Sequence, residues 1–416
     1  MLFRFSLYGF LKNQKYFEPF ILLSFIEKGL TFTSIGILIG FREVAITLLE
    51  IPSGAVADLY GRRRSMILSF FAYIVSFIIL AESSRLYLLT IAMLLFAVGE
   101  AFRTGTHKAM IFDWLRREGR IGERLEVYGR TRSWSKLGSA LSALIAAGYV
   151  FVSGNYSSVF WLCTVPYVLN IVNFLGYPAY LDAQNEWRAS FKGALGFSWR
   201  AVQMAASVRG LRNLVLESML LEGTYKVVKD YLQPILEKLA LALPVFLLIP
   251  LFDLPSNDAR RGALLIGIVF CANYLLMSIA SRFSGRASIR VGGEENLTRI
   301  LWYVNAAQYL AMMLFLLLSW RLAAVLCFII AGVIQNLFRP TQISRFDTVS
   351  PAEMGATILS VESQAKALAA ALIAPLVGYG VDRLLLETDT AFAFWPVAAA
   401  GLLSCSLAIL RRLSLH

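Results

Sequence analysis

Acidic and basic side chains interrupt several apolar stretches of this 416-residue sequence, and they are the residues best suited to bind a polar ligand or carry a proton. Glu222, Lys226 and Asp230 are spaced four residues apart, so a helix would place them along one face. An ionisable group at the centre of a bilayer costs about 3 kcal/mol on insertion scales, so it must face a cavity or a partner. We therefore expect Glu222 and Lys226 to line a cavity for a polar or charged ligand.

A second polar stripe lies upstream. Glu100, Arg103 and His107 are three and four residues apart, which again favours one helical face. The candidate cavity residues are Glu100, Arg103, Glu222, Lys226, Gln335 and Asn336. Glu362 and Lys366, also four apart, are interpreted as an ion pair without a ligand role, and the same interpretation stays open for the other pairs.

Two carboxyl groups, Glu43 and Glu222, are candidates for proton coupling. A desolvated carboxyl group holds a proton more readily than one in water, so it can bind and release protons near neutral pH. Arg42 is adjacent to Glu43, and neighbouring residues of a helix point to different faces, so Arg42 could equally neutralise a partner elsewhere. Transport that still followed a pH gradient in Glu43→Gln would remove Glu43 from this role.

The elements that hold these residues must be membrane-spanning helices. Hydrophobic residues make up 58% of the chain and charged residues 16%, whereas a soluble domain carries about 25% charged residues. The apolar stretches approach the ~20 residues needed to cross a bilayer, and no period-two alternation indicates a β-barrel. We expect an all-α membrane protein with about twelve transmembrane helices in two six-helix halves. The expected spans are residues 17–29, 34–56, 65–81, 86–114, 133–152, 159–180, 211–236, 262–280, 300–320, 322–338, 351–379 and 392–410.

Two boundaries are left open. The first span could begin earlier, because residues 7–11 are also apolar. Residues 239–254 are apolar but broken by Pro244 and Pro250, so they are expected to extend the seventh span or to lie at the outer membrane interface. The basic N-terminal segment has no small-residue cleavage site, and the first span is therefore expected to act as an uncleaved signal anchor.

The predicted organisation is an N-terminal half over residues 1–180, a central cytoplasmic loop over 181–209 and a C-terminal half over 210–416. The formal net charge is +12, and basic residues dominate every proposed internal loop. By the positive-inside rule, those loops and both termini are cytoplasmic. Arg260 and Arg261 fit this topology worst, because they flank an external turn. No aromatic-rich soluble module accompanies the charge, so nucleic acid is rejected as a partner.

A short charged hinge joins the second and third spans. Its characteristic residues are Gly54, Asp58, Gly61, Arg62 and Arg64. Their spacing resembles the signature loop of the major facilitator superfamily, although Leu59 stands where a basic residue is expected. An ordinary positive-inside loop is the competing interpretation. Residues 99–113 and 355–360 also resemble a bacterial branch of that superfamily, whose permeases have no assigned substrate.

The resemblance covers essentially the whole chain. It implies two homologous halves working by alternating access, with spans one, four, seven and ten around a central cavity. It makes Arg103 the candidate for the functional arginine often found on the fourth span. It also implies that the hinge docks on the opposite half, with Arg62 and Arg64 anchoring it to acids or lipid phosphates. The start of the eleventh span, residues 350–355, would attract the Asp58 carboxylate through unpaired N–H groups, so Asp58→Asn should slow transport.

The leading functional prediction is a secondary active transporter that moves a small-molecule solute across the plasma membrane, the inner membrane in bacteria. We expect protons as the coupling ion, a monomer, and efflux slightly favoured over uptake. The alternative is a transport-dead receptor or a lipid-translocating protein on the same fold. An enzyme is disfavoured, because no Gly-x-Ser-x-Gly, His-Glu-x-x-His or phosphate-binding loop is present. With isolated cysteines and two histidines, we expect no metal site and no cofactor.

Overall fold

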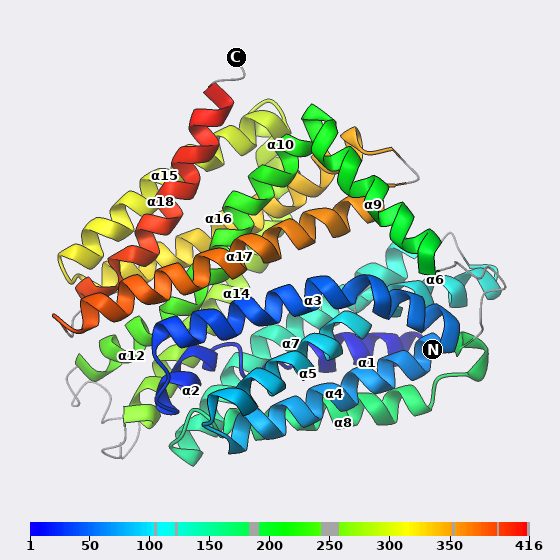
Figure 1. Cartoon of the computed structure of the whole chain (residues 1–416), viewed down its shortest axis with the longest axis horizontal. Coiled ribbons are helices and arrows are strands. Elements are labelled where there is room, and N and C mark those ends of the chain that lie inside the picture. Colours follow the sequence, from blue (N-terminus) through cyan, green and yellow to red (C-terminus); the bar gives the residue numbers. More distant parts are fainter. Residues whose placement is uncertain are drawn as a thin grey trace. The chain divides into compact units, whose positions relative to one another are not determined.

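The computed structural model is built of helices (Figure 1). It describes residues 1–103, 106–120, 124–182, 191–242, 258–351, 354–388 and 391–413, and these residues contain no β-strand. The hydrophobic composition explains why the chain forms helices. Inside a membrane, a single segment satisfies all its backbone hydrogen bonds only as a helix, since strands would have to close into a barrel.

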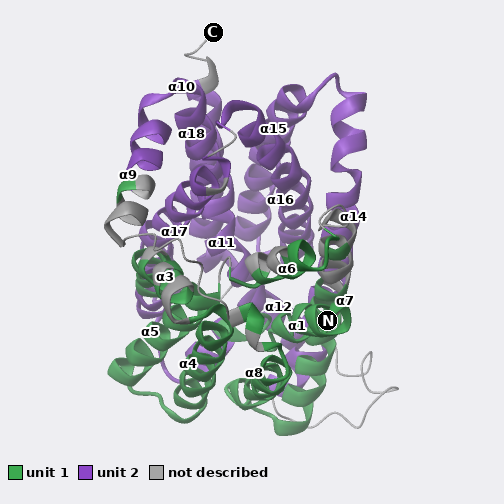
Figure 2. Cartoon of the chain, turned by 90° about the vertical axis from the view of Figure 1, so that its right-hand side faces the viewer, with its two compact units in different colours: residues 1–21, 41–196 green, residues 22–40, 197–416 purple. Residues whose placement is uncertain are grey.

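Two compact units divide the chain (Figure 2): unit 1 comprises residues 1–21 and 41–196, and unit 2 comprises residues 22–40 and 197–416. Unit 1 contains α1 (Leu2–Lys12), α4 (Arg62–Glu82), α5 (Leu86–Arg103), α6 (Thr106–Arg117), α7 (Arg124–Ser153), α8 (Val159–Leu175) and η2 (Ala179–Asp182). Helices with residues in both units are α2 (Ile21–Glu27), α3 (Phe32–Tyr60) and α9 (Phe191–Ser207). The predicted boundaries of the two halves stay a prediction.

Unit 2 holds the remaining described helices. They are α10 (Arg209–Ser218), η3 (Met219–Gly223), α11 (Thr224–Val228), η4 (Lys229–Tyr231), α12 (Leu232–Ala242), α14 (Asp258–Arg290), α15 (Glu294–Leu317), α16 (Arg321–Val349), α17 (Gly355–Leu385), η5 (Ala391–Phe394) and α18 (Trp395–Leu413). The proline-containing segment 243–257 lies outside the described residues. Helix α9 lies inside the segment predicted as the central loop, so that part of the loop is helical.

The expected pattern of spans is confirmed in the described part of the chain. Eight helices are long and apolar enough to cross a membrane: α3, α4, α5, α14, α15, α16, α17 and α18. Two shorter apolar helices, residues 138–153 of α7 and the whole of α8, supply the fifth and sixth spans. The first span is divided into α1 and α2, and the seventh into the segments from α10 to α12. Together these make up the about twelve spans predicted in an all-α membrane protein.

Several helices extend beyond their predicted spans, among them α16, which continues to Val349 and not to residue 338. Helix α1 begins at Leu2, so the first span starts earlier than residue 17, as the apolar residues 7–11 allowed. Helix α7 begins at Arg124, before the predicted residue 133. Helix α14 continues through residues 281–290, which were interpreted as an internal loop. A helix of 33 residues is about 50 Å long at 1.5 Å per residue, so α14 is longer than the ~30 Å hydrocarbon core.

The first part of α3 packs tightly on α17 within unit 2. Gly36 allows this approach, because a Cβ atom there would overlap the backbone carbonyl of Ala374. Asp382 of α17 accepts hydrogen bonds from the backbone N–H groups of Phe32 and Thr33, at 2.9 and 2.7 Å. A carboxylate at a helix N-terminus satisfies N–H groups that have no intrahelical partner and complements the helix dipole. Asp382 therefore fixes the start of α3.

Aromatic rings fill the core of unit 1. Phe174 at the end of α8 stacks on Tyr177, with ring centroids 4.3 Å apart. It also meets Phe70 of α4 and Tyr8 of α1 edge to face, at 5.2 and 5.4 Å. Such pairs add about 0.5–1.5 kcal/mol beyond the burial of their surface. This aromatic core holds α1, α4 and α8 together.

Candidate functional site

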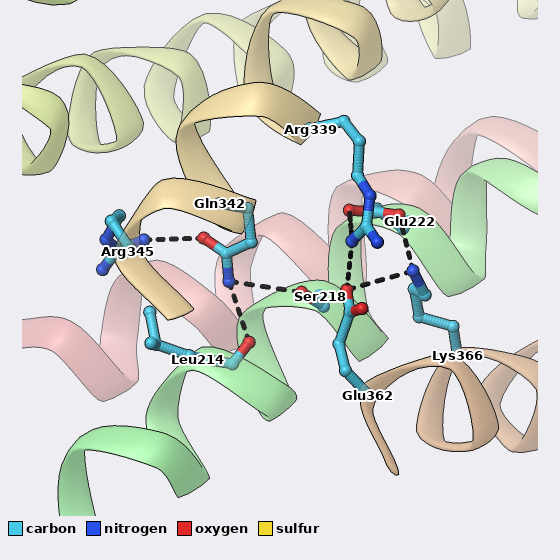
Figure 3. Close-up of polar contacts among 8 residues, drawn as sticks. All are labelled: Leu214, Ser218, Glu222, Arg339, Gln342, Arg345, Glu362 and Lys366. Carbon is cyan, nitrogen blue, oxygen red and sulfur yellow. Dashed lines mark hydrogen bonds and ion pairs between the residues drawn. The ribbon is translucent and has the colours of Figure 1, made fainter. Parts of the chain in front are cut away.

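Four ionised side chains form one cluster inside unit 2 (Figure 3). Glu222 of η3 contacts Arg339 of α16 through one carboxylate oxygen and Lys366 of α17 through the other, each at 3.0 Å. Glu362, one helical turn before Lys366, accepts hydrogen bonds from Lys366 at 3.0 Å and from Arg339. Each carboxylate thus contacts both cations, and the four formal charges cancel.

Burial makes this cluster energetically costly to disturb. Glu362 is fully buried, and Glu222 and Lys366 are 7% and 9% exposed. The side chain of Arg339 is 31% exposed, so it is the member most accessible from outside. Removing one partner of a buried ion pair leaves an uncompensated charge and typically costs about 3–5 kcal/mol. A ligand or a proton that replaced one of these contacts would therefore change the charge compensation of all four side chains.

The backbone of the seventh span brings Glu222 to α17. Residues Met219–Gly223 form a π-helix, a geometry that often occurs at functional sites. Gly223 follows Glu222 directly, and a Cβ atom at Gly223 would lie 2.7 Å from the Cβ of Ala369 and 3.1 Å from the carbonyl oxygen of Lys366. Only glycine fits this contact without movement, so Gly223 sets the close approach that joins Glu222 to Lys366.

A polar seam continues from the cluster along α16. Gln342 is three residues beyond Arg339, and its amide nitrogen donates to the carbonyl oxygen of Leu214 at 2.9 Å and to the hydroxyl of Ser218 at 3.2 Å (Figure 3). Residues three apart on a helix lie on neighbouring parts of one face. The same face of α16 therefore carries the contacts to both η3 and α10.

Arg345 ends this seam. It donates to Glu217 of α10 at 2.6 Å, to Glu295 of α15 at 2.7 Å and to the side-chain oxygen of Gln342 at 2.8 Å. A cavity of about 710 Å³ adjoins these residues. Its lining includes Glu217, Arg345, Glu295, Asn213, Trp302 and Ile409. The volume lies within the range of small-molecule sites, and the cavity adjoins the Arg345 end of the seam.

Unit 1 contains a second charge pair, in which Arg103 is buried and Glu100 is partly exposed. Glu100 and Arg103 of α5 are in direct contact, and the hydroxyl of Tyr73 on α4 donates to the other carboxylate oxygen of Glu100. Gly99 allows this arrangement, because a Cβ atom there would lie 2.7 Å from the ring of Tyr73. The predicted stripe is thus present on α5 at Glu100 and Arg103, with Tyr73 as a partner that the sequence did not identify.

His107, the third member of the predicted stripe, has different neighbours. Residues 104–105 between α5 and α6 lie outside the described residues. The ring centroid of His107 lies 3.9 Å from that of Tyr8, and its Nε2 atom is 3.4 Å from the hydroxyl of Tyr177. His107 therefore belongs to the aromatic core of unit 1.

The expected separation of Arg42 and Glu43 is wrong. Arg42 Nη2 contacts Glu43 Oε1 at 3.0 Å, although the two residues are adjacent in α3. The long arginine side chain turns back along the helix, and its guanidinium also lies 5.3 Å from the ring centroid of Phe96. Glu43 is 6% exposed. Its role in proton coupling stays a prediction, but a partner for Arg42 is present next to it.

The other predicted cavity residues of unit 2 lie near the cluster in sequence and differ in environment. Lys226 is exposed, whereas the carboxylate of Glu222 is bonded to Arg339 and Lys366. Asn336 donates to the carbonyl oxygen of Gly332 at 2.9 Å. That the residues of unit 1 and unit 2 line one cavity stays a prediction.

The hinge predicted at residues 54–64 is mostly helical. Helix α3 continues through Gly54 and Asp58 to Tyr60, and α4 starts with Arg62. Gly61 alone breaks the helix, with φ at 102°, a conformation that favours glycine. The connection between the two helices is therefore a single residue, shorter than the hinge of residues 54–64 that the sequence predicts.

The basic residues of this turn lie in the first turn of α4. Arg64 is exposed, and Arg63 donates to the carbonyl oxygen of Tyr177 at 2.9 Å, just beyond the C-terminal end of α8. A cation near a helix C-terminus complements the dipole there. The side chain of Asp58 lies outside the described residues, and its docking on the start of the eleventh span stays a prediction.

Arg339 and the seam residues Gln342 and Arg345 are absent from the predicted cavity set. Arg339 was visible as a charge directly before Pro340 in the tenth span, and its three-residue spacing to Gln342 and Arg345 was the available signal. Their partners lie on other helices, in some cases more than 100 positions away, as in the bond between Arg339 and Glu222. Spacing along one helix cannot reveal such pairs.

Comparison with known proteins relates most of the chain to one family. A family model described as Major Facilitator Superfamily matches residues 13–375. An uncharacterized MFS-type transporter, YxaM of Bacillus subtilis (strain 168), is 25% identical over 232 residues, which cover 54% of this chain and 55% of that protein. An uncharacterized transporter of Buchnera aphidicola subsp. Schizaphis graminum (strain Sg) is 26% identical over 160 residues, 38% of each chain. The chain thus spans about half or less of the length of these curated relatives.

Solved structures share the fold. The D323A mutant of the nucleoside transporter NupG superposes with a TM-score of 0.76 at 13% identity, covering 98% of this chain and 99% of that one. A POT family transporter in complex with 5-aminolevulinic acid has a TM-score of 0.69 at 13% identity, covering 98% and 95%. At this identity the likeness concerns the fold alone.

Proposed function

The chain belongs to the Major Facilitator Superfamily, and from that premise we propose that it is a secondary active transporter that moves a small polar solute across a membrane by alternating access. It is a multi-pass membrane protein with the transporter fold of that superfamily. The observation that carries the proposal is the buried cluster of Glu222, Arg339, Glu362 and Lys366. Four charges inside a membrane protein are retained at a considerable energetic cost, which indicates function.

The cluster supports proton coupling through Glu222. Its two carboxylate oxygens contact different cations on different helices, Arg339 of α16 and Lys366 of α17. A proton on Glu222 would remove the negative charge that holds both cations and would leave Glu362 as their remaining carboxylate partner in the cluster. Because a buried pair depends on complete compensation, this single protonation can favour a second arrangement of the three helices.

Several further properties belong to the same proposal. They are an outward direction of transport, residence in the bacterial inner membrane with cytoplasmic termini, and a monomeric state. The positive-inside distribution of basic residues supports the orientation. The polar cluster argues against the alternative of a lipid-translocating protein, because acyl chains find no favourable contacts among four ionised side chains.

Reconstitution tests this proposal. Purified protein in liposomes loaded with a pH-sensitive dye is exposed in turn to sugars, nucleosides, amino acids, amines and organic acids. We expect at least one solute to cause proton movement in the wild type and in Glu387→Gln, which alters an exposed carboxylate of unit 2. Glu222→Gln should lose the proton movement. Lipid scrambling without any solute-dependent signal would instead support the lipid-translocating alternative.

A further inference from the structure

Among the described residues, several buried acceptor oxygens of unit 2 have no hydrogen-bond donor, and three of them come from residues on or beside one face of α16. These three are Oε2 of Glu362, Oε1 of Gln335 and Oδ1 of Asn273. Glu362 is fully buried and Asn273 is 6% exposed. Buried polar atoms in native proteins are almost always hydrogen-bonded, so three unmatched acceptors beside one helix require an explanation.

The three acceptors follow one face of α16. Gly332, Gln335 and Arg339 are three and four residues apart, which places them on one face over about 10 Å of helix. At one end, a Cβ atom on Gly332 would lie 3.1 Å from Asn273 Oδ1. At the other end, Arg339 is bonded to Glu362, whose second oxygen is the unmatched one. Gln335 lies between them in the sequence.

The residue opposite Gly332 adds a polar group at the same place. A Cβ atom on Gly332 would also lie 3.0 Å from the hydroxyl of Tyr225 in α11. Tyr225 and Asn273 therefore converge over Gly332 from two different helices, α11 and α14. Glycine is required at this point, because a Cβ atom would also lie 2.4 Å from Cε of Met277, so the neighbouring side chains already pack against the backbone of α16.

The charges decide which ligand suits this face. Arg339 and Lys366 are each bonded to both carboxylates, so the cations are matched by equal negative charge. At this face of α16, the unmatched atoms of Asn273, Gln335 and Glu362 are acceptors. A carboxylate or phosphate would bring more acceptors and would have to break an existing ion pair to bind, whereas a group with N–H or O–H donors can bind without breaking one.

We propose that this face of unit 2 binds an uncharged, donor-rich solute, such as a polyol, an amide or a nucleobase, through Asn273, Gln335 and the free oxygen of Glu362. The inference rests on the proposed transport function, because it names the class of solute for that site. Gln335 and Asn273 fix the position of the solute, while the four-charge cluster keeps its internal ion pairs.

Thermal unfolding of the purified full-length protein tests this assignment with matched pairs of probes. The pairs are glucose and glucuronate, uridine and uridine 5′-monophosphate, and N-acetylasparagine amide and N-acetylaspartate, each at 10 mM. A ligand that binds the folded state raises its unfolding temperature. We expect at least one uncharged member to raise the unfolding temperature by several degrees and its acidic counterpart to raise it less.

Two variants separate specific binding from general effects. Gln335→Met removes one acceptor of the face and should abolish the shift caused by the effective probe. Gln308→Met is the matched control, because Gln308 is another buried amide of unit 2 with an unmatched oxygen, on α15. Its shift should equal that of the wild type. Each shift is measured against the same variant without probe, so a lower intrinsic stability does not affect the comparison.

Three results would overturn the inference: a larger shift from an acidic probe than from its uncharged counterpart, a shift that survives Gln335→Met, or no shift from any uncharged probe. The assay uses no membrane gradient, so it does not depend on coupled transport. A probe that binds as expected but is not moved in liposomes would count against the transport proposal and leave the binding assignment standing.

Discussion

Lys366 Nζ lies 3.0 Å from Glu222 Oε2, although 144 positions separate the two residues in the chain. The contact joins the π-helical turn of the seventh span to α17. Both side chains are more than nine-tenths buried, and both are also bound to other members of the same cluster. The stability of unit 2 and the proposed proton coupling therefore depend on the same few atoms.

Replacing the lysine should destabilise the protein. Lys366→Met removes one of two cations that compensate Glu222 and Glu362, and we expect a loss of about 3 kcal/mol in the free energy of unfolding. Lys229→Met is the control, because Lys229 is a third exposed and lies 3.8 Å from Asp230. Its loss should stay below about 1 kcal/mol. Denaturant titration in detergent gives both values, and equal losses would contradict a special role for Lys366.

Gly223 should tolerate no side chain. Gly223→Ala introduces a Cβ atom 2.7 Å from that of Ala369, and overpacking of this kind costs about 1–3 kcal/mol. Gly285→Ala in α14 meets nothing within 4 Å and should stabilise its helix by up to about 1 kcal/mol. Denaturant titration of the two variants measures these opposite signs. A neutral result for Gly223→Ala would show that η3 and α17 are further apart.

The turn between α3 and α4 should depend on Gly61. Its φ of 102° is strained for any other residue, so Gly61→Ala should cost about 1–2 kcal/mol. Gly54→Ala, seven residues earlier in the same motif, lies within α3 with nothing within 4 Å and should be neutral or slightly stabilising. Thermal unfolding of both variants compares the two glycines. Equal sensitivity would mean that the segment 54–60 is not helical.

Asp382 should protect the first turn of α3 from opening. Asp382→Asn removes the charge that accepts from the N–H groups of Phe32 and Thr33, and loss of such a cap costs about 1 kcal/mol. Hydrogen exchange of residues 32–36 should become several times faster, while exchange in α15 stays unchanged. Glu387→Gln, an exposed neighbour in the sequence, serves as control. Unchanged hydrogen exchange in Asp382→Asn would show that Asp382 does not stabilise the first turn of α3.

Much of the fold was predictable because membrane insertion constrains composition so strongly. Apolar runs of about 20 residues are expected to form membrane-spanning helices, and the number of such runs predicts about twelve spans. The division of the first and seventh spans into shorter helices was harder to predict from the sequence. The π-helix at Met219–Gly223 depends on how Gly223 meets α17, and no local pattern encodes that contact.

The candidate site was predictable only in part. Glu222 was identified because an acid inside an apolar run is costly, and the pair of Glu362 and Lys366 followed from its spacing. The joining of that pair to Glu222 and Arg339 is a tertiary contact, which spacing along single helices does not determine. The predicted pair of Glu362 and Lys366 is present as part of this larger cluster, and its lack of a ligand role stays a prediction.

The most direct test of the central claim compares two transport modes in Glu222→Gln, using the solute found in the liposome screen. Exchange of labelled for unlabelled solute across the membrane needs no net proton movement, whereas accumulation driven by a pH gradient does. We predict that Glu222→Gln keeps exchange near the wild-type rate and loses gradient-driven accumulation, while Glu387→Gln keeps both. Gradient-driven accumulation that persists in Glu222→Gln would contradict the assignment of Glu222 as the proton-coupling residue.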